Sequence, residues 1–126
     1  MRFCIRDIFL ALSFVIVFSS CSGVFYLPSR EMVIVPSDVG LKYRDIEFVT
    51  EDGVKLHSWL LLSDEPRALV VFFHGNAQNI SYHLSSVSWL PSLGVDVLAV
   101  DFRGYGKSEG SASLEGAQLD VRAGVN

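Results

Sequence analysis

Two short apolar runs, separated by a segment of helical length, constrain the fold of this chain more than any other feature. The first run covers residues 68–73 and the second covers residues 95–100. Unbroken apolar runs of this length are typical of strands buried on both faces of a parallel sheet. Residues 79–93 between them have apolar side chains near helical spacing, with His83 predicted at the surface. We therefore predict a βαβ unit and an α/β fold.

Two alternating segments precede this unit and predict an antiparallel hairpin. Residues 43–50 and 54–62 each alternate between apolar and polar side chains, and the Glu51-Asp52-Gly53 sequence between them is typical of a turn. We expect one face of the hairpin to be solvated, with His57 on that face. After the second apolar run, Ser111-Ala112-Ser113 predicts the start of a final helix.

Both apolar runs end in polar sequences that contain glycine. The first is followed by His74-Gly75-Asn76-Ala77 and the second by Asp101-Phe102-Arg103-Gly104-Tyr105-Gly106-Lys107-Ser108. Carboxyl ends of parallel strands meet at one edge of the sheet, where open α/β folds place their sites. A glycine lets the backbone turn sharply, which can direct N–H groups into a cleft. We expect Arg103 to hold its loop by hydrogen bonds or to pair with Asp101.

Together, the two motifs and their spacing resemble the α/β-hydrolase family, in its serine aminopeptidase-like and Bem46-like branch. The resemblance covers about residues 43–126 and implies the amino-terminal part of a hydrolase sheet. It also implies that the loop after the first apolar strand supplies one N–H of the oxyanion hole. Asn76 is the first candidate donor and Ala77 the second, while His74 and Gly75 shape the loop. A preorganised donor of this kind is worth about 3 kcal/mol to acyl transfer.

The string Gly106-Lys107-Ser108-Glu109-Gly110 fits the G-x-S-x-G pattern, but its position argues against Ser108 as a nucleophile. A nucleophile elbow lies directly between a strand and a helix. Here the predicted strand ends near Asp101, and more loop follows the string. In related hydrolases the elbow lies on the next strand, and the Asp and His of the triad come later. No histidine follows His83, so we predict a fold truncated before the elbow, without a complete triad.

Three functional hypotheses follow. The first is the front part of a serine hydrolase acting on ester, thioester or peptide bonds. The second is a non-catalytic secreted lipoprotein that binds or assembles with another chain through an unpaired strand. The third is a small enzyme that uses Ser108. Because strand 68–73 would form an exposed apolar edge, we expect residues 43–126 alone to show no sharp cooperative melt as a monomer.

The amino-terminal residues 1–21 predict a targeting segment. Arginines at positions 2 and 6 precede an apolar run over residues 8–18, and small residues follow, as in a secretory signal. The Phe18-Ser19-Ser20-Cys21 sequence resembles a bacterial lipobox, which implies lipidation of Cys21. An uncleaved membrane anchor is the alternative, because no charge interrupts residues 8–27, about the length of a membrane span.

Either alternative predicts a protein of the cell envelope, anchored to a membrane and facing outside the cytoplasm. Residues 22–42, with two prolines, then predict a tether that leads into the domain or packs along it. The domain itself would cover residues 43–126.

Composition argues against several other classes of function. The net charge is −4 and no basic patch follows Arg30, so nucleic-acid binding has little support. Cys4 and Cys21 are the two cysteines, which leaves residues 22–126 without a disulfide or a thiolate metal site. Neither a G-x-G-x-x-G nor a P-loop sequence occurs. We therefore expect no cofactor and no metal, and a small ester or peptide as substrate only if the hydrolase fold is completed.

Overall fold

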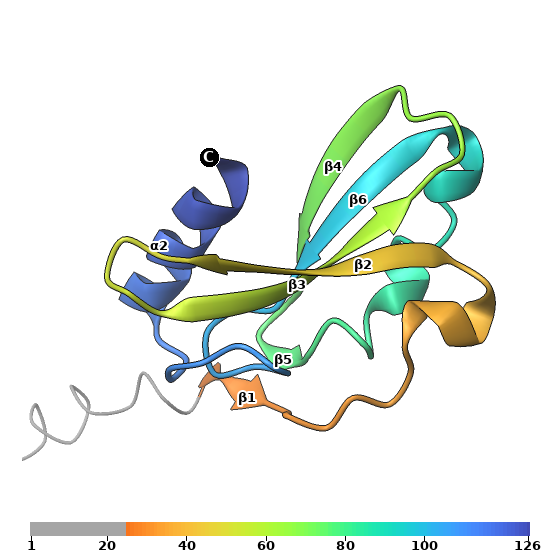
Figure 1. Ribbon diagram of the computed structural model, residues 1–126. Helices are drawn as coiled ribbons and strands as arrows, with labels where there is room; N and C mark the ends of the chain where they lie inside the picture. Colours follow the sequence, from red (N-terminus) through yellow and green to blue (C-terminus); the bar gives the residue numbers. More distant parts are fainter. Residues whose placement is uncertain (1–24) are drawn as a thin grey trace, which may run out of the picture.

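The structure, a computed structural model, describes residues 25–126, and its centre is a four-stranded sheet (Figure 1). The strand order in this sheet is β2-β3-β6-β4. Its strands are β2 (Lys42–Val49), β3 (Lys55–Leu62), β4 (Ala68–Phe73) and β6 (Val95–Val100). A small second sheet joins β1 (Leu27–Pro28) to β5 (Ala77–Gln78) in parallel. The predicted signal, the anchor and Cys21 lie outside the described residues.

The pairing of the strands confirms the predicted hairpin and the parallel unit. β2 and β3 pair antiparallel over their whole length, and β4 pairs with β6 in parallel. β6 lies between β3 and β4, so β4 forms an edge of the sheet. Among the described residues no strand pairs with the outer side of β4, whose Leu69 and Val70 are exposed. This is the exposed apolar edge that the sequence predicts.

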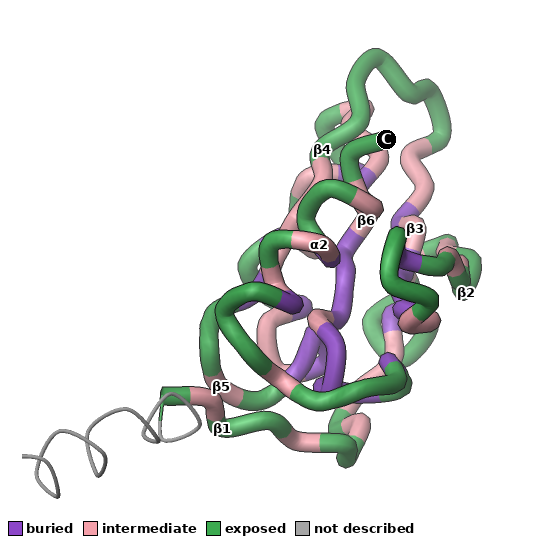
Figure 2. Tube along the Cα trace, turned by 90° about the vertical axis from the view of Figure 1, so that its left-hand side faces the viewer, coloured by how far each residue is buried: buried purple, intermediate pink, exposed green. Residues whose placement is uncertain are grey.

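The hydrophobic core lies against the middle of the sheet, where the buried segments gather in Figure 2. Its members are Trp59, Leu61, Ile80, Leu84, Val87, Val97 and Ala99. The prediction of a solvated hairpin face is wrong for β3, because residues 56–59 are buried on both faces. β3 is an inner strand between β2 and β6, and the crossover between β4 and β6 covers it.

The predicted helix over residues 79–93 is wrong in type. The crossover contains two 3-10 turns, η3 (Leu84–Ser86) and η4 (Pro91–Leu93), and most of its backbone bonds span three residues. Asn79 and Ser81 compete with helical bonding, since the Asn79 side chain accepts from the Ser81 N–H at 2.9 Å. Proline at position 91 removes a further donor. Of the apolar side chains at the predicted spacing, Ile80, Leu84 and Val87 are nevertheless buried, and Leu90 is partly buried against the core.

The last element is the helix α2 (Leu114–Val125), which begins where the sequence predicts. The Ser113 hydroxyl caps it by accepting from the Gly116 N–H at 3.1 Å. The helix packs through small residues, because a Cβ on Gly116 would lie 2.4 Å from Arg103 Cδ and one on Gly124 would lie 2.8 Å from Phe73 Cζ. Its large apolar side chains therefore lie on the outer face, where Leu114 is exposed.

The described part of the predicted tether, residues 25–42, lies along the domain. β1 pairs with β5, the Val33 N–H donates to Ser81 Oγ at 3.1 Å, and residues 32, 34 and 35 pack against the core. A 3-10 turn, η2 (Pro36–Val39), then leads into β2. Within residues 25–126, no helix combines the length and the apolar character that crossing a membrane requires. The division into tether and domain stays a prediction.

Candidate active site

The loop after β4 is held by His74, which is buried at the carboxyl end of the sheet. His74 Nδ1 lies 2.7 Å from the Gly75 carbonyl oxygen. Since a carbonyl can only accept, Nδ1 carries the proton and donates. In a trans peptide unit the C=O and the following N–H point in opposite directions. The bond from His74 therefore also fixes the direction of the Asn76 N–H.

Three aromatic rings hold the His74 imidazole in place. The ring stacks on His83 with centroids 5.6 Å apart and meets Phe102 and Tyr105 edge-on at 5.3 and 4.9 Å. The prediction of His83 as a surface side chain is wrong, because this ring is half-buried and its Nε2 lies 3.1 Å from the Ala77 carbonyl oxygen. Both histidines therefore shape the loop.

A second set of bonds fixes the next peptide unit. The Asn76 carbonyl accepts from the Leu27 N–H and from the Tyr105 hydroxyl, both at 2.8 Å. The N–H of Ala77 points away from these two donors, and Ala77 belongs to β5. Neither the Asn76 N–H nor the Ala77 N–H donates to an acceptor among residues 25–126. The two candidate donors differ in position, because Asn76 lines the cavity described next and Ala77 does not.

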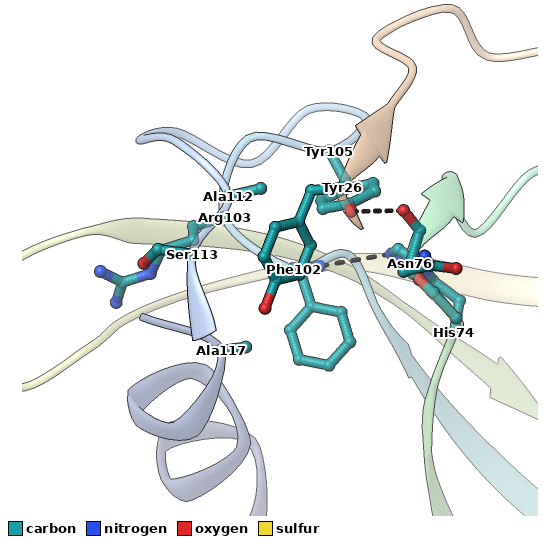
Figure 3. Close-up of a pocket in the computed structure, with 10 residues that line it drawn as sticks. Tyr26, His74, Asn76, Phe102, Arg103, Tyr105, Ala112, Ser113 and Ala117 are labelled. Carbon is teal, nitrogen blue, oxygen red and sulfur yellow. Dashed lines mark hydrogen bonds between the residues drawn. The ribbon is translucent and has the colours of Figure 1, made fainter. Parts of the chain in front are cut away.

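A cavity of about 220 Å³ opens beside this loop (Figure 3). Its lining is formed by Tyr26, His74, Gly75, Asn76, Phe102, Arg103, Tyr105, Ala112, Ser113 and Ala117. Aromatic rings and alanine methyl groups give it a largely apolar wall, and Asn76 is among the polar residues that line it. The backbone at Gly75 has no positive φ, and a Cβ there would meet no atom within 4 Å. This glycine leaves open space beside the Asn76 N–H.

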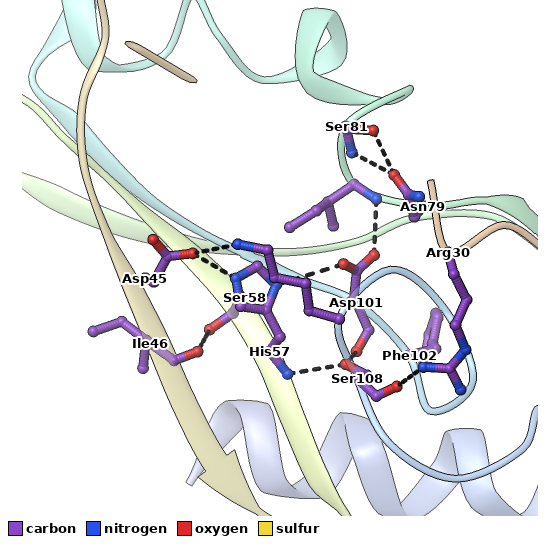
Figure 4. Close-up of polar contacts among 12 residues, drawn as sticks. Arg30, Asp45, Ile46, His57, Ser58, Asn79, Ser81, Asp101, Phe102 and Ser108 are labelled. Atoms are coloured by element: carbon purple, nitrogen blue, oxygen red, sulfur yellow. Dashed lines mark hydrogen bonds and ion pairs between the residues drawn. The ribbon is translucent and has the colours of Figure 1, made fainter. Parts of the chain in front are cut away.

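Asp101 follows the last residue of β6, and Figure 4 shows it between His57 and the segment that carries Asn79 and Ser81. Its fully buried carboxylate accepts from the Ile80 N–H at 2.8 Å and lies 3.4 Å from His74 Nε2. Burial by itself raises the pKa of Asp101, but His57, His74 and the Ile80 N–H outweigh it and hold this pKa below its usual value. The carboxylate is thus a fixed negative charge under the loop.

The prediction of a solvated His57 is wrong. The ring is buried, with Nε2 2.6 Å from Asp45 Oδ1 and Nδ1 3.6 Å from Asp101 Oδ2. Burial lowers the pKa of His57, but the two carboxylates outweigh this effect and raise the pKa above its usual value. Alternation along β3 does not identify such a residue, because the carboxylates that face it come from β2 and from the end of β6.

The raised pKa of His57 makes stability depend on pH. The folded state binds the proton more tightly, so the stabilisation is complete below about pH 6.5 and is lost as the pH rises through the folded pKa. We expect the free energy of unfolding to decrease as the pH rises above about 6.5, and less steeply in His57→Gln. Urea unfolding over this range measures both slopes. Equal slopes in the two proteins would contradict the assignment.

Comparison with known proteins identifies the family. Residues 64–122 match the family model of the serine aminopeptidases, S33. The uncharacterized protein YfhR of Salmonella typhi is 36% identical over 109 residues, which cover 82% of this chain and 36% of YfhR. Protein Bem46 of Schizosaccharomyces pombe is 38% identical over 101 residues, which cover 77% of this chain and 34% of Bem46. The chain belongs to the α/β-hydrolase family.

The fold agrees with this α/β-hydrolase assignment. The Pyrococcus furiosus esterase Pf2001 superposes with a TM-score of 0.64 and 31% sequence identity, over 79% of this chain and 40% of the esterase. The predicted fold class and the resemblance to the hydrolase branch are therefore confirmed. The chain spans about a third of the length of the curated relatives it matches.

In this member of the α/β-hydrolase family, Ser108 is a structural residue next to Asp101 and His57. It is fully buried, its hydroxyl donates to the Asp101 carbonyl at 2.7 Å, and the same oxygen accepts from the His57 N–H at 2.9 Å. A hydroxyl in this position has no open path to a substrate carbonyl. The turn around Ser108 ties β3 to the end of β6.

Arg103 does not pair with Asp101, so this alternative of the sequence prediction is wrong. Its guanidinium forms a two-bond fork with Asp52 at 2.7 and 2.9 Å, and its Nε donates to the fully buried Asp120 at 2.8 Å. Burial raises the pKa of Asp120 despite the opposing effect of Arg103. Arg103 thereby joins the hairpin turn, the loop after β6 and α2.

The sequence alone did not identify Tyr26 as a residue of the cavity wall, nor Tyr105 as a donor to the loop. Both contacts bring together segments about 30 to 50 residues apart, and no local pattern marks them. Among residues 25–126, no group of three or more His, Cys, Asp or Glu side chains is arranged to hold a metal ion.

Proposed function

We propose that this chain is the amino-terminal part of a membrane-tethered serine hydrolase of ester, thioester or peptide bonds. In this proposal, the loop of residues 74–77 supplies one donor of the oxyanion hole. The observation that carries it is the 2.7 Å bond from His74 to the Gly75 carbonyl, which orients an otherwise unused Asn76 N–H beside the cavity.

The chemical role of this donor follows from its rigidity. When a nucleophile attacks an acyl carbon, the carbonyl oxygen becomes an oxyanion, and a fixed N–H stabilises it without reorganising. Such a donor is worth about 3 kcal/mol of transition-state stabilisation. The rings around His74 and the Asp101 carboxylate beneath it supply the required rigidity. In this proposal the nucleophile, acid and base come from a part of the hydrolase outside residues 25–126.

The tether in this proposal is the amino-terminal segment. Lipidated Cys21, or an uncleaved anchor over residues 8–27, holds the domain at a membrane surface of the cell envelope. The apolar run, its flanking arginines and the small residues before Cys21 support this part of the proposal. An acyl-modified mass on a chain that begins at Cys21 distinguishes the first anchor from the second.

Mass and active-site labelling of the protein isolated from its own membranes test the proposal. We expect a fluorophosphonate probe to label one serine, and a peptide map to place that serine outside residues 25–126. Labelling of Ser108 would favour the small-enzyme hypothesis. Absence of labelling, with hydrolysis of neither nitrophenyl esters nor peptide amides, would overturn the hydrolase proposal.

A substitution at Gly75 tests the role of the loop. A Cβ at this position meets no atom, so Gly75→Val leaves the fold intact but fills the space beside the Asn76 N–H. We expect kcat/KM for a nitrophenyl ester to decrease at least about tenfold, with an unchanged melting temperature. Gly53→Ala, at a distant turn with equally open space, is the control for activity, and its positive φ of +84° affects stability without reaching the site. Undiminished activity in Gly75→Val would exclude the loop from the site.

One observation favours a second candidate, a non-catalytic binding or assembly module. The outer side of β4 is unpaired within the described chain, and it carries the exposed Leu69 and Val70. A strand from another chain could pair there, since main-chain groups of an edge strand bind an added strand. This candidate predicts a stable complex after gentle extraction and no probe-labelled serine in either partner.

A further inference from the structure

The residues that follow the predicted anchor form a strap across both loops of the site. We use the term strap for residues 25–31. On one side, the buried Asn79 side chain donates to the carbonyls of Ser29 at 3.0 Å and Glu31 at 2.7 Å. The carbonyl of Phe25 accepts from the Asn76 side chain at 2.5 Å. The strap is therefore fixed to the loop that carries the Asn76 N–H.

On its other side, the strap holds the glycine-rich turn after β6. The Arg30 guanidinium donates to the Ser108 carbonyl at 2.7 Å (Figure 4). The Gly106 N–H donates to the Ser29 carbonyl at 2.8 Å. Bonds on both sides fix the path of the strap, and with it the point at which the preceding chain approaches the domain.

The start of the strap lies beside the cavity. Tyr26 is part of the cavity wall, as Figure 3 shows. Its two neighbours face solvent, with Phe25 70% exposed and Leu27 64% exposed. These two side chains, which we call the apolar rim, are adjacent in sequence to the only strap residue that lines the cavity. An exposed aromatic ring and an exposed leucine that flank a residue of the cavity wall provide apolar surface for a contact with lipid.

The length of chain before the rim limits its distance from the membrane. Cys21 and Phe25 are four residues apart, which corresponds to at most about 14 Å of extended chain. The headgroup layer of one leaflet is about 5–8 Å thick. A chain anchored at Cys21 thus holds the rim within reach of the bilayer surface. A span over residues 8–27 would place the rim in the interface itself.

We propose that the apolar rim contacts the bilayer that holds the amino terminus, and that the site acts on acyl esters resident in that bilayer. The substrate class rests on the proposed hydrolase function. The acyl chain enters the apolar cavity without crossing water, and the ester carbonyl reaches the Asn76 N–H at the cavity edge. Hydrolysis consumes one water, which supplies the hydroxyl of the released acid and the proton of the released alcohol.

Photocrosslinking tests the membrane contact independently of hydrolysis. The full protein, with its own anchor, is reconstituted in vesicles of phosphatidylethanolamine and phosphatidylglycerol. It carries p-benzoylphenylalanine in place of Phe25 or, as a control, in place of Leu93. Leu93 is 62% exposed and precedes β6, at the end of the sheet away from β1. We expect lipid adducts by mass at position 25 and not at position 93. No adduct at position 25, or equal adducts at both, would overturn the contact.

Hydrolysis in the same vesicles tests the substrate class. We expect the double variant Phe25→Ser/Leu27→Ser to cleave methylumbelliferyl oleate in vesicles at least about fivefold more slowly, with soluble methylumbelliferyl acetate changed less than about twofold. Leu93→Ser is the matched control. Equal losses on both esters would overturn the substrate class. Hydrolysis of neither ester by the unsubstituted protein, with adducts at position 25, would overturn the proposed function and leave the membrane contact standing.

Discussion

Arg103→Ala is expected to lower the free energy of unfolding by about 3–5 kcal/mol. Arg103 is buried, and its Nε and backbone N–H both bind the fully buried carboxylate of Asp120, at 2.8 and 2.9 Å. Without the guanidinium, Asp120 is left as an uncompensated charge between α2 and the loop after β6. Urea unfolding of the intact protein measures the loss.

Two further variants separate the buried contact from the exposed one. Asp52 binds the same guanidinium but its side chain is 40% exposed, so Asp52→Asn is expected to cost much less stability than Arg103→Ala. Asp120→Asn in the Arg103→Ala background is expected to restore part of the stability, because it removes the buried charge. A loss below about 1 kcal/mol in Arg103→Ala would contradict the assigned role of this pair.

Gly106→Ala is the second change with a large expected effect. Gly106 has φ +47°, and a Cβ there would lie 2.0 Å from Asp101 Oδ2. The left-handed backbone costs an alanine about 1–2 kcal/mol, and the clash adds about 1–3 kcal/mol. We therefore expect urea unfolding to show a free energy of unfolding that is lower by about 3 kcal/mol. The displaced Asp101 carboxylate would also lose its contacts with His74 and the Ile80 N–H, so ester hydrolysis is expected to fall as well.

Gly53→Ala is the control for backbone strain alone. Gly53 also has a positive φ, of +84°, but a Cβ there meets no atom within 4 Å. We expect Gly53→Ala to lower the free energy of unfolding only by the conformational cost, about 1–2 kcal/mol, and to leave activity unchanged. If the two alanine variants lost equal stability, the contact between Gly106 and Asp101 would have no energetic weight.

Local patterns predicted the strands well and the crossover less well. The runs at residues 68–73 and 95–100 became β4 and β6 with the predicted bounds, since a short apolar segment gains most from burial in a sheet. Residues 79–93 bury the side chains that helical spacing predicts, yet they form 3-10 turns. The spacing of apolar residues predicts which side chains are buried. The type of backbone turn also depends on the hydrogen bond that Asn79 accepts and on the donor that Pro91 lacks.

The candidate site, like the fold, was predicted only in part. The sequence indicated the loop of residues 74–77, because a polar glycine-containing stretch after a buried strand lies at the edge where α/β folds place their sites. It did not indicate how His74 uses Nδ1, nor that His57 and Asp101 lie together beneath the loop. These roles depend on which carboxylates the sheet order brings close.

The sequence by itself determined the α/β class, the hairpin, the parallel pair, the cap at Ser113 and the family. Each depends on residues close together in the chain, or on motifs whose spacing is fixed by one crossover. Only the tertiary structure decided the burial of His57, the partners of Arg103 and the entry of Tyr26 into the cavity wall. Those contacts join segments such as Asp52 and Arg103, 51 residues apart. Packing of the strap, sheet and helix determines them, and no local pattern encodes that packing.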